Sequence, residues 1–221
     1  YKTHLTETVT PEAPQLFVDV HTSPAPKGDS DDLPQIHLRL SERKMLPQTH
    51  LVDGNYVSAE LLIDSREQHH VDLFGPARPD TSAQGQAKAG FAASDFQINF
   101  EQHYAICPGG KRSRTFSERA EQRYGQPKIF IQFSPSDCQL CPLKAQCTQA
   151  KRGARSLQLH SRAQYEALQE ARRRQLTPQF KPVYDQRAGI EGTISQAARV
   201  FELHQTRYRG LAKNTLRDVF I

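Results

Sequence analysis

The sequence lacks any long apolar run. None of its apolar stretches approaches the roughly 18–20 residues that a membrane-spanning helix needs. The first residues, YKTHLTETV, alternate polar and apolar side chains and lack the basic start and apolar middle of an export signal. We therefore expect neither a membrane protein nor an exported one. Hydrophobic residues make up 37% of the chain and the mean hydropathy is −0.68, so a core is possible beneath a large polar surface.

Acidic residues are scarce in the second half of the chain. Residues 1–100 contain 8 Lys and Arg against 14 Asp and Glu, whereas residues 101–221 contain 21 against 10. A half that basic favours a polyanionic partner, most simply nucleic acid, although a solvated basic surface without a partner has the same composition. The chain starts with Tyr rather than Met and ends in the apolar stretch LRDVFI, so we expect a segment of a longer protein.

The first 75 residues predict an α/β arrangement. Alternating polar and apolar residues predict strands, with Tyr1 and Leu5 as candidates for the buried side of the first. An apolar stripe through Leu33, Ile36 and Leu40 predicts a helix, and a Ser start signal predicts another. The order implies a mixed sheet covered by helices. The predicted strands are 1–9, 13–23, 49–53 and 70–76, joined in part by a turn at 10–14, and the predicted helices are 33–46 and 58–68.

Residues 76–160 break this pattern, because they are rich in Gly, Pro, Ser and Gln and contain every cysteine. We interpret them as an insertion with its own small fold. The chain is helical again from Ser161, and Thr177 followed by Pro178 has the pattern of an N-cap and a first-turn proline. The predicted division is therefore residues 1–75 as the first part of a core, 76–160 as the insertion, and 161–221 as helices that complete the core.

There are few cysteines: Cys107, Cys138, Cys141 and Cys147. The C-x2-C pair at 138 and 141 can reach one ion, and the other two thiolates can complete the tetrahedron of a closed structural zinc site. Two disulfides or four unrelated thiols are the alternatives, but disulfides need an oxidising compartment. A redox C-x2-C pair is disfavoured because no βαβ pattern surrounds it.

Histidines give a weaker signal. His103 and His160 flank the insertion and are possible zinc ligands in place of a cysteine, although exposed histidines are the default interpretation.

Two acids stand out by their position. Asp53 ends the predicted strand 49–53, at the kind of sheet edge where α/β proteins bind ligands, but Asp before Gly-Asn is also a turn former. Glu191 shares one helix face with Tyr184 at i−7 and Arg187 at i−4. A carboxylate among arginines stays ionised and suits a divalent metal, and the same Arg and Tyr side chains suit a phosphate backbone. The simpler interpretation is an exposed i,i+4 salt bridge.

Two glycines, Gly189 and Gly192, bracket Glu191. They weaken the helix but permit the close approach of another backbone, which a plain salt bridge does not require.

Seven stretches, in order, resemble the DDE-type transposases of bacterial insertion sequences, in the group with a four-cysteine insertion before the last catalytic acid. They are YKTHLTET, LVDGNYVSAELL, GPARPDTS, CPGGK, DCQLCPLKAQCT, LTPQFKPVYDQRAGIEGTISQAAR and TRYRGLAKNTL. They extend over essentially the whole chain, and their common order is more specific than any one of them.

The resemblance implies a ribonuclease H-like catalytic core, a mixed sheet flanked by helices and interrupted by a zinc-ribbon-like insertion. In such enzymes three acids bind two divalent metals, Mg²⁺ or Mn²⁺. Asp53 matches the second acid and Glu191 the third, with Tyr184 and Arg187 completing the Y-(2)-R-(3)-E signature. The basic residue that ends this signature would fall at Ala198, and the nearest base is Arg199.

Two further departures from the family pattern concern the acids. The Gly that usually precedes the Tyr after the second acid is replaced by Asn55, with Gly54 one place earlier. The strand that carries the first acid lies before the strand YKTHLTET, so this chain should lack a complete metal site. Asp19 is the nearest strand acid and a poor substitute.

The resemblance also implies a partner, DNA, as transposon ends and as target, with a homodimer in the active complex and a bacterial cytoplasmic, nucleoid-associated location. The expected phosphate contacts are Tyr184, Arg187, Arg199, Arg207, Arg209 and Lys213, with Arg172–Arg174 as either contacts or a solvated face. A decayed remnant that only binds DNA, or a metal-dependent nuclease without transfer activity, would have much the same sequence.

Overall fold

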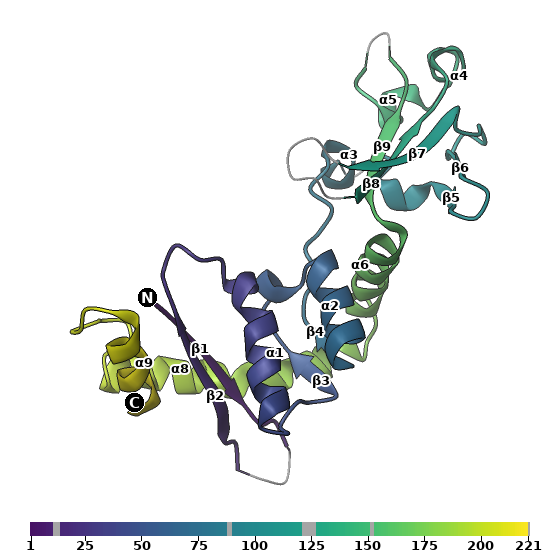
Figure 1. Ribbon diagram of the computed structural model, residues 1–221. Helices are drawn as coiled ribbons and strands as arrows, with labels where there is room; N and C mark the ends of the chain where they lie inside the picture. The colour runs from purple at the N-terminus through teal and green to yellow at the C-terminus, as the bar shows by residue number, and fades with distance from the viewer. Residues whose placement is uncertain (11–13, 88–89, 121–126, 151–152, 221) are drawn as a thin grey trace. The chain divides into compact units, whose positions relative to one another are not determined.

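The computed structural model divides the chain into two compact units (Figure 1). It describes residues 1–10, 14–87, 90–120, 127–150 and 153–220. The first unit comprises Tyr1–Ala77 and Ala171–Ile221, and the second comprises Arg78–Glu170. In these described ranges, no helix combines the length and apolarity that crossing a membrane requires.

The first unit opens with an antiparallel strand pair, as the alternating sequence predicts. β1 (Lys2–Glu7) pairs with β2 (Phe17–Ser23). Leu5 is half-buried, but the prediction that Tyr1 is buried is wrong: it is 44% exposed, because it precedes the first paired residue of the ladder. The turn predicted at 10–14 lies partly outside the described residues.

Helices and a parallel strand pair follow. Leu33, Ile36 and Leu40 form the buried stripe of the first helix, at 1%, 3% and 0% exposure, which confirms the predicted face. Ser58 caps the second helix by accepting the Leu61 N–H, as its position predicts. The elements are α1 (Leu33–Glu42), β3 (Thr49–Leu51), α2 (Ala59–His69) and β4 (Asp72–Phe74).

The strands of this unit form two separate pairs rather than one sheet. β1 pairs only with β2, and β3 pairs in parallel with β4. The predicted single mixed sheet is therefore not formed within the described residues, although both pairing directions and the covering helices are present (Figure 1). Among the described residues, each of β1 and β3 keeps one edge without a strand neighbour.

A histidine pair is buried between α1 and β3. His37 Nε2 lies 3.0 Å from His50 Nδ1, and the His69 ring packs 5.2 Å from the His37 ring. Burial lowers the pKa of His37 to about 3, with the neighbouring histidines adding to the fall, and burial lowers the pKa of His50 to about 4. The folded state therefore keeps both rings neutral at physiological pH.

This pair predicts a loss of stability in mild acid. Both folded-state pKa values lie below the ordinary value of about 6.5, so the unfolded state takes up protons before the folded state does as the pH falls. The free energy of unfolding is therefore at its full value above about pH 6.5 and decreases below it. Between pH 7 and pH 5 we expect a loss of at most about 2 kcal/mol per histidine. Urea unfolding at both pH values should show a smaller pH effect in His37→Gln than in the wild type. The exposed control His204→Gln should keep the wild-type pH effect; equal pH effects in the three proteins would contradict the assignment.

The C-terminal segment is helical, with a start that differs from the prediction. Thr177 does not cap a new helix: its backbone N–H and its hydroxyl both donate to the Arg174 carbonyl, so it closes the preceding helix instead. The next helix has Gln179 at its N-cap, and Phe180 stacks between Phe74 and Tyr184. The helices are α6 (Arg162–Gln175), α7 (Phe180–Tyr184), α8 (Ala188–Val200) and α9 (Leu211–Phe220), with a 3₁₀ turn at Asp185–Arg187.

Two polar anchors hold these helices to the strands of the first unit. Arg174 binds Asp72 with one guanidinium nitrogen 2.8 and 2.7 Å from its two carboxylate oxygens, donates to the Leu73 carbonyl and lies over the Phe74 ring. Arg174 therefore has a structural role rather than that of a phosphate contact. At the other end, Asp218 of α9 is 4% exposed and accepts hydroxyl hydrogen bonds from β1 and β2, at Thr3 and Thr22.

The second unit surrounds a compact core of its own. Its hydrophobic cluster contains the fully buried Ala105, Ile129 and Ile131, and Tyr165 of α6 packs against it. We predicted an insertion over 76–160; the division at Arg78 and Glu170 takes in the first turns of α6 as well. The remaining elements are α3 (Ala83–Gln86), β5 (Gln97–Asn99), β6 (Tyr104–Ile106), β7 (Thr115–Ala120), β8 (Pro127–Gln132), α4 (Pro135–Gln139), α5 (Lys144–Cys147) and β9 (Ser156–His160).

Candidate active site

Asp53 lies directly after β3. The ladder with β4 continues through the Val52 N–H, which donates to the Phe74 carbonyl, and Asp53 then caps the 3₁₀ turn Gly54–Tyr56. Its Oδ1 accepts the Asn55 N–H at 2.9 Å. The two interpretations of this acid, strand end and turn former, both describe its local geometry.

A cavity of about 780 Å³ in the first unit is lined by Asp53 and Arg187. Its wall includes the consecutive residues Thr3–Thr10 and the consecutive residues Thr49–Asp53. Since successive side chains of a strand point to opposite faces, a wall of consecutive residues means that the cavity runs along strand edges rather than over one face. The cavity therefore lies against both β1 and β3. Side chains of α1 and α8, including Leu40 and Ile190, also line it.

Glu191 lies in the first turn of α8, one residue beyond Ile190, and does not itself line the cavity. Its side chain is 65% exposed, and Oε1 lies 2.6 Å from Nη1 of Arg187, which is 19% exposed. The i,i+4 salt bridge expected as the simpler interpretation is therefore present. Exposed helix pairs of this kind contribute about 0.3–0.5 kcal/mol, so the pair orients Glu191 more than it stabilises the helix.

The two glycines beside Glu191 do not serve the backbone contact that we expected. A Cβ at Gly189 would lie 2.5 Å from the Gln15 side-chain oxygen, which is the flexible end of a side chain, and a Cβ at Gly192 would meet nothing within 4 Å. The expectation was wrong because only one of the two positions is crowded, and it is crowded by an amide.

The charges of both acids affect the pKa of the Tyr184 phenol. Burial raises the pKa of the Tyr184 phenol, the charges of Asp53 and Glu191 raise it further, and Arg187 opposes them by its charge and by a hydrogen bond. Both carboxylates therefore act electrostatically on one phenol, with the arginine of the signature beside it.

A buried polar network supports the same side of the unit and was missed in the sequence. His4 Nδ1 lies 2.6 Å from the Tyr56 hydroxyl, and His4 Nε2 lies 3.2 Å from Asp32 Oδ2, an ion-pair distance without hydrogen-bond geometry. Asp32 is fully buried and also accepts from His21 and Lys27. Although burial opposes ionisation, these donors, with Ser23, hold the pKa of Asp32 below its usual range.

The network could not be read from sequence because it depends on strand register. His4 and His21 face each other across the β1–β2 ladder, and only the pairing brings both to Asp32. Burial, followed by nearby carboxylates including Asp32 and Asp53, raises the pKa of Tyr56, so its hydroxyl stays protonated as a hydrogen-bond partner for His4.

Asp19, the strand acid considered as a substitute for the first acid, forms ion pairs with two arginines. It is 2% exposed, and its carboxylate accepts hydrogen bonds from Arg39 and Arg43. To bind a metal ion, this carboxylate would have to lose its hydrogen bonds to the two guanidinium groups.

The other expected DNA contacts lie on the exposed part of the C-terminal segment. Arg199 donates to the Ser195 carbonyl of its own helix, and Arg207 pairs with Glu202. Arg209 and Lys213 are exposed. These positions are compatible with phosphate contacts.

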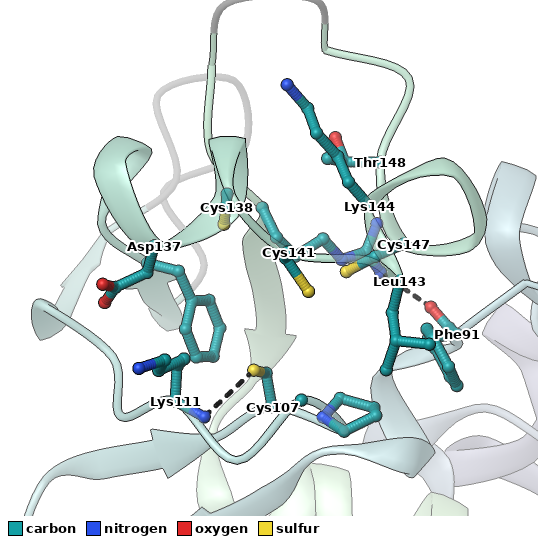
Figure 2. A pocket seen from close by; sticks show the side chains of 14 residues that line it. Phe91, Cys107, Lys111, Asp137, Cys138, Cys141, Leu143, Lys144, Cys147 and Thr148 are labelled. Carbon is teal, nitrogen blue, oxygen red and sulfur yellow. Dashed lines mark hydrogen bonds between the residues drawn. The ribbon is translucent and has the colours of Figure 1, made fainter.

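The four cysteines line one pocket of the second unit (Figure 2). Cys107 follows β6, Cys138 lies in α4, Cys141 lies just after α4, and Cys147 ends α5. All four are free, so the two-disulfide alternative is not formed. Burial raises the pKa of the Cys147 thiol, and the other three cysteines add to the rise while Arg155 opposes it.

Backbone turns present these sulfurs to the pocket. The Lys111 N–H lies 3.4 Å from Cys107 Sγ, at the end of a turn in which Gly110 has the left-handed φ of 75°. A Cβ at Gly109 would lie 3.4 Å from Cys141 Sγ and 3.7 Å from Cys107 Sγ. In the part of the chain that the structure describes, however, no group of three or more His, Cys, Asp or Glu side chains has the arrangement of a metal site.

His103 and His160, the histidines considered as zinc ligands in place of a cysteine, do not line this pocket. His160 Nδ1 lies 3.1 Å from Lys128 Nζ, and the His103 ring packs against Phe116.

The comparison with protein families identifies the chain. A family model described as Transposase DDE domain matches residues 106–220, just over half of the sequence. That span contains the four cysteines, Tyr184, Arg187 and Glu191, but not Asp53. No curated protein and no solved structure matches the chain. With the Tyr-Arg-Glu signature inside the matched span, the chain belongs to the family of transposase DDE domains.

Proposed function

We propose that this chain is part of the ribonuclease H-like catalytic domain of an insertion-sequence transposase, which cleaves DNA strands and joins them to a target. Asp53 and Glu191 are the proposed ligands of divalent cations, Mg²⁺ or Mn²⁺. The observation that carries the proposal is the single cavity lined by Asp53 and by Arg187, the partner of Glu191. These parts of the chain are separated by more than half of the sequence, and folding brings them to one wall.

The donor set has the right chemistry for such cations. Carboxylate oxygens are the ligands that Mg²⁺ and Mn²⁺ prefer, and the ion pair with Arg187 holds Glu191 in place. When bound, paired metals would activate water or a 3′-hydroxyl and stabilise the leaving oxygen in an in-line displacement. The residues of the chain orient the carboxylates: the Asn55 N–H fixes Asp53, and Arg187 fixes Glu191.

A third carboxylate is needed, and the volume of the cavity is enough for a few residues of a strand that would deliver it. A strand residue occupies roughly 3.3 Å along the strand, 4.8 Å between strands and 10 Å between packed layers, so 780 Å³ corresponds to about five residues. The free edges of β1 and β3 both border the cavity. A strand placed there would join the two separate pairs into one sheet and end beside Asp53.

Zinc is the second metal of the proposal. We infer that Cys107, Cys138, Cys141 and Cys147 hold a structural Zn²⁺, because four free thiols line one pocket and one already accepts a backbone N–H. A bound cation would lower the pKa of each thiol and draw the sulfurs together.

The partner of the enzyme would be DNA, as transposon ends and target, with two copies of the chain in the active complex. The exposed Arg199, Arg207, Arg209 and Lys213 are the proposed phosphate contacts of the C-terminal segment. A non-catalytic DNA-binding remnant is the second candidate, and the exposure of Glu191 together with its pairing to Arg187 favours it. A strand-transfer assay with a 3′-hydroxyl donor, after the missing strand is supplied, separates transfer from hydrolysis and from binding alone.

Metal binding tests the catalytic assignment directly. Titration of the chain with Mn²⁺, followed by electron paramagnetic resonance, should reveal a weak site that Asp53→Asn and Glu191→Gln each weaken by tenfold or more, since even outer-shell partners of a metal typically contribute about 10–100-fold. The weak affinity is expected because Asp53 and Glu191 supply two carboxylates, whereas the proposed kind of site uses three.

Glu166→Gln is the matched control, because Glu166 also pairs with an arginine at i,i+4, Arg162, and is 53% exposed. Its Mn²⁺ affinity should equal that of the wild type. Equal losses in all three variants, or no site in the wild-type chain, would refute the pairing of Asp53 with Glu191.

A further inference from the structure

The antiparallel sheet β7–β8–β9 has two chemically different faces. Its register aligns the strands in rows of three residues, one from each strand, and successive rows point to opposite faces. One face carries the buried side chains of the core. The rows of that face are Phe116, Ile131 and Leu157, and Glu118, Ile129 and Leu159.

The opposite face is polar and contains no acid. Its rows hold hydroxyls, amides, two cations, an imidazole and a phenyl ring. They are Thr115, Gln132 and Ser156; Ser117, Phe130 and Gln158; and Arg119, Lys128 and His160. We call these residues the open face. Because no member is a carboxylate and two carry positive charge, the open face attracts anions.

Phe130 sits at the centre of the open face under a guanidinium group. Arg119 Cζ lies 4.1 Å from the centroid of the Phe130 ring, and Arg119 is exposed. Lys128 lies in the same row as Arg119, with its Nζ 3.1 Å from His160 Nδ1. Phe130 of β8 and Arg119 of β7 therefore form a flat aromatic and guanidinium platform, with a second cation, Lys128, beside it.

A flat platform flanked by cations and amides fits unpaired nucleotides. Bases stack on aromatic rings and on the plane of an arginine side chain, while lysine and arginine contact the phosphates between them. A duplex would satisfy the two charges but would leave the Phe130–Arg119 platform without a stacked base, because the bases of a duplex are already stacked on one another. The ring and the charges together therefore favour a single strand.

We propose that the open face of β7–β8–β9 binds single-stranded DNA. A base stacks on the Phe130–Arg119 platform, Lys128 contacts a phosphate, and the amides of Gln132 and Gln158 lie in the neighbouring rows. This surface belongs to the second unit, whereas Asp53 and Glu191 belong to the first. It goes beyond the proposed metal chemistry, and either proposal can fail without the other.

The test measures binding of the full chain to a fluorescent oligothymidine by anisotropy over a series of salt concentrations. Phe130→Leu keeps an apolar side chain but removes the stacking platform, and it should weaken binding about tenfold, within the range that stacking of one base contributes. Phe130→Tyr should restore wild-type affinity. Arg119→Gln should weaken binding by removing half of the platform. Lys128→Gln should weaken binding and reduce the slope of log affinity against log salt by about 0.7, the change expected for one phosphate contact.

Arg162→Gln is the matched control, since it removes the same charge from an exposed arginine of α6 outside the open face. It should leave the affinity unchanged. Wild-type affinity in Phe130→Leu, or equal losses in Arg119→Gln and Arg162→Gln, would overturn the proposal. So would tighter binding to a duplex of the same sequence, because charge alone would then explain the binding. A thermal melt of each variant by circular dichroism shows whether it is folded. Because Phe130→Tyr keeps an aromatic ring, wild-type affinity in that variant shows that the loss in Phe130→Leu comes from the missing ring.

Discussion

Removing zinc is expected to open the cysteine pocket of the second unit. The chain as purified should contain one Zn²⁺, and a strong chelator should expose the turns that hold Cys107, Cys138, Cys141 and Cys147. Structural zinc in small peptides contributes about 10–16 kcal/mol of apparent binding free energy at pH 7, comparable with the whole stability of a domain. Hydrogen exchange should rise over 107–111 and 134–148, while the buried Ile129 and Ile131 retain part of their protection.

Substitutions separate zinc binding from general packing. Cys138→Ser and Cys141→Ser should each lose the metal, measured by elemental analysis after gel filtration, and should melt at a lower temperature than the wild type. Thr148→Ser changes a residue of the same pocket that has no sulfur, and it should keep one Zn²⁺ per chain. A metal-free wild type whose melting temperature is insensitive to chelator would contradict the zinc assignment.

Loss of the Asp32 carboxylate is the second large effect expected. Asp32→Ala would leave His21, Lys27 and His4 clustered without the buried charge that holds them, and removing one partner of a buried ion pair typically costs about 3–5 kcal/mol. Because domains are stable by only about 5–15 kcal/mol, the variant should unfold at a much lower urea concentration. Circular dichroism suits the measurement, since the chain has no Trp.

Asp29→Ala provides the control for this variant. Asp29 lies in the same 3₁₀ turn, Asp29–Asp32, but is 37% exposed and pairs only at the surface with Lys2. Surface pairs contribute about 0–1 kcal/mol, so its urea midpoint should stay near the wild-type value. Similar midpoints for the two variants would show that Asp32 is not the centre of the network.

Local signals allowed the prediction of the α-helices and β-strands of residues 1–75. Ser58 caps α2, the stripe Leu33–Ile36–Leu40 faces inward, and the alternation of β1 and β2 is the alternation of an antiparallel pair. These features depend on residues a few positions apart, for which propensity and periodicity are informative. The predicted helix start at Thr177 was wrong because its hydroxyl and its N–H both donate to the Arg174 carbonyl. Thr177 therefore ends the preceding helix.

Long-range features escaped prediction. The separation of the strands into two pairs, the cavity along their edges and the meeting of His4 with Asp32 all depend on register and on packing between distant segments. Of the candidate site, position and resemblance together selected Asp53 and Glu191, but neither gave the exposure of Glu191 nor its commitment to Arg187. The family match itself covers Glu191 and leaves Asp53 as a prediction.

The two faces of the β7–β8–β9 sheet have a consequence for how this region tolerates change in evolution. Core residues and open-face residues alternate along β8, as Lys128, Ile129, Phe130 and Ile131. A substitution at one position alters one face only. An insertion or deletion of a single residue within β8 shifts every following side chain to the opposite face, which would bury Lys128 or Phe130 in place of isoleucine. Insertions and deletions in this unit should therefore be confined to the connections between strands, while the strands themselves change only by substitution.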